Sequence, residues 1–228
     1  LIISLYPDDA IAAGFKRSGL PVVLVDAYHP QLTSLVVNNV EGAYQAVRCL
    51  IEHGHRRIGF INGKSEGDFH FNPGNDRFIG LHRALGEAGL LYEPDLVLTA
   101  GWNRQGGRQA ALHLLSRPDR PTAIFAASDE QAAGVLEAAR SLKLAVPGDL
   151  SVIGFDGIEL SDILELSTVQ QPMKYMGELG AQKLLEQIEG AAKGGSPPEL
   201  IRLQPNLIVR RTISGPPSVH EAIPKQEA

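Results

Sequence analysis

The feature that most constrains the fold is a regular alternation of short apolar runs with longer amphipathic segments. Six runs rich in β-branched and aromatic residues recur along the chain: LIISL (1–5), PVVLVD (21–26), RIGFIN (57–62), DLVLTA (95–100), TAIFAAS (122–128) and LSVIGFD (150–156). Runs that stay apolar at successive positions are typical of strands buried on both faces of a sheet. Because helical patterns separate them, the sequence predicts an α/β fold with parallel sheets and right-handed crossovers.

Three intervening segments show the 3.6-residue period of an amphipathic helix. Their apolar stripes are Ala43, Ala46, Val47, Leu50 and Ile51; Phe78, Leu81, Leu85 and Ala88; and Ala132, Val135, Leu136, Ala139 and Leu142. A further helix is expected from about Met173 to Glu189, after the polar, extended stretch STVQQP at 167–172.

Two places indicate that the chain passes between two α/β lobes. Residues 35–40 lead directly into a helix instead of a turn, and the stretch 167–172 does the same. We predict an N-terminal lobe of residues 1–37 and 170–200, and a C-terminal lobe of residues 38–169 and 201–213. The segment 191–200 reads as a loop. Residues 214–228, rich in proline and charge without a period, are predicted to form a disordered tail.

Composition excludes several classes of protein. The formal net charge of −5 opposes a surface that follows nucleic-acid phosphates, so this chain alone is a poor nucleic-acid binder. No run approaches the roughly 20 apolar residues of a membrane span, and no export signal is present at the start. The single cysteine, Cys49, fits a reducing compartment. The sequence therefore predicts a cytoplasmic protein without a membrane segment.

Polar residues follow the carboxyl ends of several predicted strands, which is where open α/β sheets bind ligands. Arg77 belongs to the same set because it begins the helix that follows Asn62, at the end of another strand. The candidates selected in this way are Asp26, Arg77, Trp102, Ser128, Asp129 and Asp156. Carboxylates that accept from hydroxyls, a guanidinium that donates and an indole face that stacks suit a small polyhydroxylated or heterocyclic molecule.

Each candidate also has a purely structural interpretation. Ser128 or Asp129 is a suitable N-cap for a helix starting at Glu130. Asp156 followed by Gly157 is also common turn chemistry. Trp102 could belong to the core, although its neighbours are typical of a loop.

Motifs of common enzymes are not matched. GFINGKS (59–65) resembles a phosphate-binding loop, but Ile58 stands where that pattern requires its first glycine. EHGHRR (52–57) lacks a third ligand at metal spacing. No GxGxxG or HExxH string occurs. We therefore expect no cofactor, no metal and no catalytic residue.

Four strings, taken in order, resemble one family. They are EGAYQAVRCLIEHGHRRIGFI (41–61), NDRFIGLHRALGEAGL (75–90), PTAIFAASDEQAAGVLEAARSLKLAVPGDLSVIGFDG (121–157) and STVQQPMKYMGELGAQKLLEQI (167–188). Together they are similar to the effector-binding core of the lactose-repressor (LacI/GalR) transcription regulators, over residues 1–213. The resemblance implies a type I periplasmic-binding-protein-like fold, in which two Rossmann-like lobes hold a small effector between them.

The resemblance also carries site residues over by position. Family positions that contact effector match Asp26, Arg77, Trp102, Asp156 and Gln171, with Phe155 beside the site. The strand-end argument selects four of these independently. Ser128 stands where many members of the family place asparagine, followed by the usual aspartate, here Asp129, so the identity of the effector is open.

The chain departs from the family at its start. Members carry a helix-turn-helix, a hinge helix and the first elements of the N-terminal lobe before the point that resembles LIISL. The N-terminal lobe is therefore expected to be incomplete, with an unpaired sheet edge and exposed apolar faces. We expect that the chain is a fragment of a longer protein, or that a partner chain covers the place of the missing elements.

The favoured function is the sensor domain of a transcriptional regulator. A sugar-like effector would control operator binding by a helix-turn-helix outside this chain, and the family implies a homodimer. The alternative is a solute-binding protein of a sugar ABC transporter, and an enzyme acting on a sugar or nucleoside lacks an acid–base pair. Asp156→Ala and Arg77→Ala are each expected to abolish effector binding and leave the fold intact.

Overall fold

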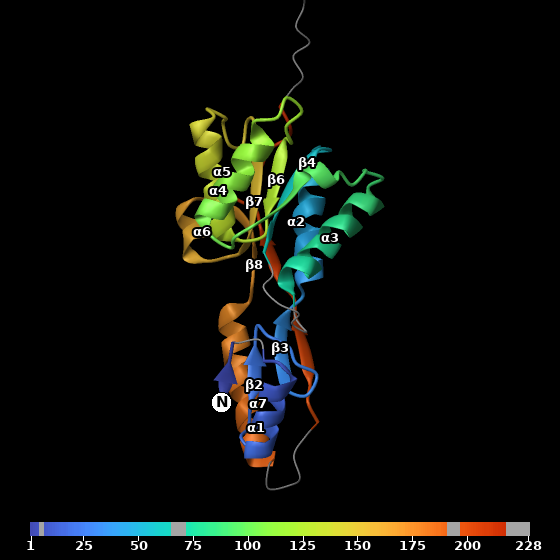
Figure 1. Ribbon diagram of the computed structural model, residues 1–228. Coiled ribbons are helices and arrows are strands. Elements are labelled where there is room, and N and C mark those ends of the chain that lie inside the picture. Colours follow the sequence, from blue (N-terminus) through green and yellow to red (C-terminus); the bar gives the residue numbers. More distant parts are fainter. Residues whose placement is uncertain (5–6, 65–71, 191–196, 218–228) are drawn as a thin grey trace, which may run out of the picture.

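Two α/β bodies, stacked along the long axis of the molecule, make up the fold (Figure 1). The computed structural model describes residues 1–4, 7–64, 72–190 and 197–217. Each body is built on its own sheet, and all described strand pairs but one are parallel. The predicted α/β class with parallel sheets is therefore confirmed.

The first sheet has four strands in the order β1-β2-β3-β9, with bounds Ile2–Ile3, Val23–Val25, Thr33–Val37 and Leu200–Leu203. Helix α1 (Asp9–Ser18) and helix α7 (Met173–Gly190) cover it. Successive residues of β2 face opposite sides of the sheet. Leu24 packs in a cluster with Ala12 of α1, whereas Val23 packs in a cluster with Met176 of α7. At the β1 edge, Leu1 and Ile2 are exposed.

The second sheet has six strands in the order β10-β8-β7-β6-β4-β5. Their bounds are Asn206–Ile208, Ser167–Gln170, Ser151–Asp156, Ala123–Ala126, Ile58–Gly63 and Val97–Ala100, and only β10 runs antiparallel to its neighbour. Its helices are α2 (Asn39–Glu52), α3 (Pro73–Glu87), α4 (Arg104–Leu115), α5 (Asp129–Ser141) and α6 (Glu159–Ile163), with a 3₁₀ turn, η1, at Pro94–Leu96.

Helices cover both faces of the second sheet. Helices α2 and α3 pack together and share one apolar cluster with Phe60 and Phe125, whose rings stack 5.1 Å apart. Helices α4 and α5 pack together on the other face, in a cluster with Ile61 and Ile124. The large side chains of neighbouring strand positions are thus buried on opposite faces, which explains why the strand runs are continuously apolar.

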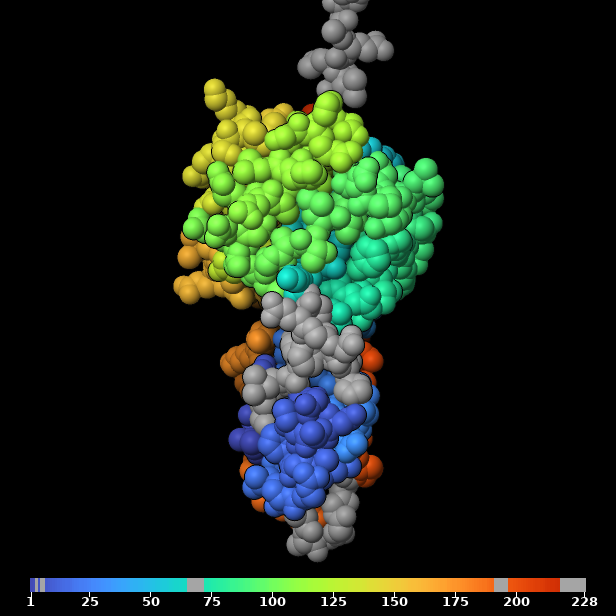
Figure 2. All heavy atoms as spheres, viewed as in Figure 1, coloured from blue at the N-terminus to red at the C-terminus, as the bar shows by residue number. Residues whose placement is uncertain are grey.

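The chain crosses between the two bodies three times, after β3, after β8 and between β9 and β10. Figure 1 shows the crossing segments between the two bodies, and Figure 2 shows that the body of the second sheet is the broader one. The pairing of β9 with β3 moves the last crossing to residues 204–205, a few residues beyond the predicted division at 200. The assignment of the two lobes as domains remains a prediction.

Ser214, the first residue of the predicted tail, is hydrogen-bonded to the second body. Ser214 is held by Ser151, whose side-chain oxygen accepts from the Ser214 N–H at 3.0 Å, and its own hydroxyl donates to Pro147 O at 2.9 Å. Ser214 O also lies 2.8 Å from Nε2 of the buried His55. The sequence pattern missed this because these partners come from distant segments. Residues 218–228 of the predicted tail, and 191–196 of the predicted loop, lie outside the described residues.

Candidate functional site

Arg77 is the centre of the candidate site and is 4% exposed. It lies in the first turns of α3, which Asn72 caps and Pro73 begins. Its Nε donates to Asn39 Oδ1 at 2.9 Å, Nη1 donates to the Ala127 carbonyl, and its guanidinium lies 3.6 Å from the centre of the Phe155 ring. These contacts hold the guanidinium plane in one orientation, as recognition of a small ligand requires.

Asp156 presents its carboxylate to Arg77 from the end of β7. Its Oδ1 lies 3.6 Å from Arg77 Nη2 and accepts a 2.7 Å hydrogen bond from Gln171 Nε2. Burial raises the pKa of the Asp156 carboxyl, and Arg77 and Gln171 oppose that rise. Its φ of 116° is rare for a residue with a side chain, and such strained backbone is concentrated at functional sites.

Asp26 reaches the same group of charges from the other sheet. It follows the last residue of β2, with a φ of 53° that is also unusual for a residue other than glycine. Burial raises its pKa to about 6, while the charge of Arg77 lowers it and that of Asp156 raises it. Carboxyl groups from both bodies are therefore close enough to Arg77 to interact electrostatically with it.

Trp102 lies at the edge of this group, between β5 and α4. Its indole N–H donates to Lys64 O at 2.9 Å, and the Arg77 guanidinium carbon lies 5.5 Å from its ring centre. The ring rests directly on Gly63, where an added Cβ would come within 1.9 Å of the indole. With 38% of its surface exposed, Trp102 is not a core residue, which removes the structural alternative.

Ser128 and Asp129 are used by the fold itself. The Ser128 hydroxyl accepts from a backbone N–H in the first turn of α5 at 3.1 Å and is the N-cap of that helix. Asp129 is fully buried and accepts from the Gly157 and Ile158 N–H groups at 2.8 and 2.9 Å, and from the Thr168 hydroxyl at 2.5 Å. Burial raises the pKa of Asp129 to about 6, although these hydrogen bonds lower it. Their ligand role remains a prediction.

The structure thus gathers six of the eight predicted residues around one guanidinium: Asp26, Arg77, Trp102, Phe155, Asp156 and Gln171. We call these six the Arg77 cluster. The Gln171 side-chain oxygen is buried with no hydrogen-bond partner among the described residues, and an atom of this kind calls for a donor. A ligand hydroxyl or N–H beside Asp156 would supply one.

Two details of the site were not foreseen. Asn39, buried at the start of α2, positions Arg77, and only its place at a helix start marked it in the sequence. Arg77 was expected to be removable without harm to the fold, but that expectation is wrong. Its burial and its bonds to Asn39 and Ala127 mean that Arg77→Ala would leave buried polar groups unsatisfied.

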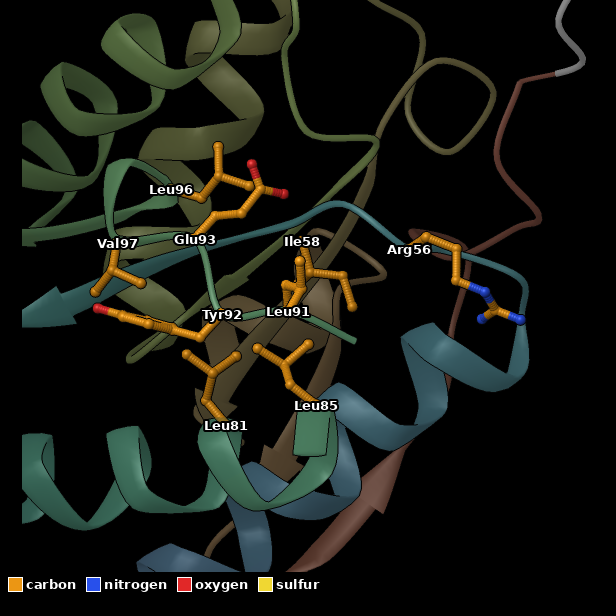
Figure 3. A pocket seen from close by; sticks show the side chains of 9 residues that line it. All are labelled: Arg56, Ile58, Leu81, Leu85, Leu91, Tyr92, Glu93, Leu96 and Val97. Atoms are coloured by element: carbon orange, nitrogen blue, oxygen red, sulfur yellow. The ribbon is translucent and has the colours of Figure 1, made fainter. Parts of the chain in front are cut away.

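One pocket beside the second sheet is too small for an effector. It lies among side chains of β4, α3 and the segment leading to β5, as Figure 3 shows, and its volume is about 10 Å³. That space holds at most one water molecule. In the described part of the chain, no group of histidine, cysteine or acidic side chains could hold a metal ion, and no helix has the length and apolar character to cross a bilayer.

Comparison with known proteins places this geometry in a family. The model of the periplasmic binding protein-like domain matches residues 47–213. The HTH-type transcriptional repressor PurR of Pectobacterium carotovorum (strain PC1) is 33% identical over 217 residues, which cover 93% of this chain and 62% of the repressor. The chain thus spans less than two thirds of the length of this curated relative.

Solved structures agree with this assignment. A LacI family transcriptional regulator from Mycobacterium smegmatis aligns with a TM-score of 0.79 and 32% identity, over 95% of this chain and 79% of that one. The transcriptional regulator CelR in complex with cellobiose aligns with a TM-score of 0.78 and 28% identity, over 92% and 64% of the two chains. The chain belongs to the periplasmic binding protein-like domain family. Within that family it is an effector-binding domain of the LacI type.

Proposed function

We propose that this chain is the sensor part of a LacI-type transcriptional regulator, and that a small sugar or related polyol binds at the Arg77 cluster. The observation that carries the proposal is the buried guanidinium of Arg77, which lies 3.6 Å from the Asp156 carboxylate and interacts electrostatically with Asp26 at the end of a strand of the other sheet. Carboxylates on two bodies can accept from hydroxyls of one ligand, so binding would draw on both bodies at once. Trp102 offers a ring face for the apolar side of a sugar.

The relatives support regulation over transport. The sequence relatives are named as repressors, and the aligned CelR structure holds cellobiose. In this proposal the effector shifts the arrangement of the two bodies, and a homodimer transmits that shift to a helix-turn-helix on operator DNA, outside these residues. Such a regulator acts in the cytoplasm and binds its effector without converting it. These names do not favour the solute-binding protein of a sugar transporter.

A ligand screen tests the proposal. Thermal unfolding would be followed with pentoses, hexoses, disaccharides and nucleosides, because a ligand at ~100 times its dissociation constant adds about 2.7 kcal/mol of stability. Calorimetry of the best compound should show that Asp156→Asn weakens binding by roughly tenfold or more, as expected for loss of a charged acceptor.

The exposed Asp95→Asn is the matched control, since Asp95 lies on η1, far along the second sheet from β7. Unchanged affinity in Asp156→Asn would remove the Arg77 cluster as the site. A panel in which only nucleosides bind would keep the site and overturn the sugar assignment.

A further inference from the structure

A second cavity of about 410 Å³ lies where the chain crosses between the two bodies. None of the residues lining it is among the eight predicted ligand contacts. The first body supplies side chains from β3, β9 and the segment after β2, whereas the second supplies side chains from the starts of α2 and α3. The lining residues that matter here are Tyr28, Val36, Asn38, Asp76, Leu200 and Arg202. Its volume falls within the usual range for small-molecule sites, roughly 300–1,000 Å³.

Two opposite charges line this cavity. Asp76 is half-buried on α3, Arg202 is exposed on β9, and the charge of Arg202 acts on the Asp76 carboxyl. Burial raises the pKa of Asp76, and Arg202 and Arg77 lower it. Among the described residues, no hydrogen bond or salt bridge is made by the side chain of Asp76 or Arg202. It costs free energy to desolvate a carboxyl that has no partner, so a ligand that bonds to Asp76 and Arg202 would stabilise both side chains.

Most other polar groups of the cavity are already engaged. Asn38 caps α2 and donates to Gln204 at 3.3 Å, and Asn72 caps α3. Tyr28 supplies a ring and a hydroxyl with no hydrogen bond among the described residues, and Val36 and Leu200 add apolar surface. Among the described lining residues, the groups left free are thus one negative charge, one positive charge, the Tyr28 hydroxyl and a short apolar wall.

We propose that this cavity is a second ligand site, which binds a small zwitterion of the α-amino acid class. The ammonium group of the ligand would be held by Asp76 and its carboxylate by Arg202, because a guanidinium matches a carboxylate with two parallel hydrogen bonds. The side chain of the ligand would lie along Tyr28 and Val36. Since the lining comes from both bodies, occupancy is linked to their relative arrangement, and such linkage is reciprocal between sites.

The test begins with the purified wild-type protein. Thermal unfolding is measured with each of the common α-amino acids, and with n-butyrate and n-butylamine, which carry only one of the two charges. We expect at least one amino acid to raise the melting temperature, and both single-charge compounds to have no effect. If no amino acid raises it, or if n-butyrate or n-butylamine does so equally, the proposal is overturned.

Calorimetry of the best amino acid then locates the site. Arg202→Gln and Asp76→Asn should each weaken its binding roughly tenfold or more, whereas Arg108→Gln, an exposed arginine on α4, should not. Retained affinity in both cavity variants would overturn the proposal. Loss of binding in Asp156→Asn, together with competition by the sugar or nucleoside found above, would also overturn it, because the amino acid would then occupy the Arg77 cluster. Sugar or nucleoside binding is a separate readout, and its absence counts against the proposed function alone.

Discussion

The side-chain amide of Gln171 donates a 2.7 Å hydrogen bond to Oδ1 of Asp156, the oxygen that faces Arg77. Gln171 lies on the crossing from β8 to α7, so it belongs to a segment that must adjust if the two bodies move. Its backbone N–H also donates to Asp156 O at 3.0 Å. Asp156 and the crossing segment are therefore joined by two hydrogen bonds, which in the proposed function would link the bound ligand to a movement of the two bodies.

Removal of that amide should weaken effector binding. Gln171→Ala leaves Asp156 without one of its donors and removes a buried acceptor oxygen that has no partner among the described residues, so we expect affinity to fall roughly tenfold. Isothermal calorimetry measures the change, and Gln182→Ala, on the exposed side of α7, is the control. Equal affinity in the two variants would contradict the link.

Stability should depend on the protonation of Asp26. Its pKa is raised from 3.8 to about 6 in the folded protein, so the folded state binds more protons than the unfolded chain between these values. The free energy of unfolding should therefore fall as pH rises through this window, by at most about 1.4 kcal/mol per pH unit for one carboxyl.

Asp26→Asn should flatten that dependence, since the amide does not titrate. Urea unfolding at several pH values between 3.8 and about 6 measures it, with Asp95→Asn as the control. Asp129 titrates in the same range and leaves a residual slope in both proteins. An identical slope with and without the Asp26 carboxyl would show that this group is not buried as described.

Gly63→Ala should displace Trp102. An alanine Cβ at this position would lie 1.9 Å from the indole, so the ring has to move away from Arg77. Because Trp102 is the only tryptophan, the intrinsic fluorescence spectrum reports its position directly. We expect a shifted emission maximum and weaker effector binding. Gly86→Ala is the control, since an added Cβ there would meet no neighbour within 4 Å apart from the backbone of its own helix. A spectrum like that of the wild type would contradict the packing of Trp102 on Gly63.

Thr168→Val should destabilise the fold without a direct effect on the ligand. The Thr168 hydroxyl donates to Asp129, and loss of a hydrogen bond to a buried charge costs about 1.5–3 kcal/mol. Chemical denaturation measures this cost, with Thr99→Val on the exposed face of β5 for comparison. A variant as stable as Thr99→Val would mean that the Asp129 carboxyl does not depend on Thr168.

Some features of this protein follow from local sequence patterns, and others follow only from contacts in the folded chain. The amino-acid sequence by itself determined the parallel α/β class, the strands β1, β2, β4, β5, β6 and β7, and the helices α2, α3, α5 and α7, because side-chain periodicity acts within a few residues. It did not determine the remaining strands and helices, whose patterns are short or polar. It also placed Asp26, Arg77, Trp102 and Asp156 at strand ends, where topology brings side chains together.

Only the tertiary structure decided which of these residues share one environment. The burial of Arg77 against Phe155, the hydrogen bond that the Gly157 N–H donates to Asp129 and the influence of the Arg202 charge on Asp76 each join segments far apart in the chain. Desolvation and Coulomb energy depend on distances in space and on the exclusion of water. The sequence carries no local record of either quantity.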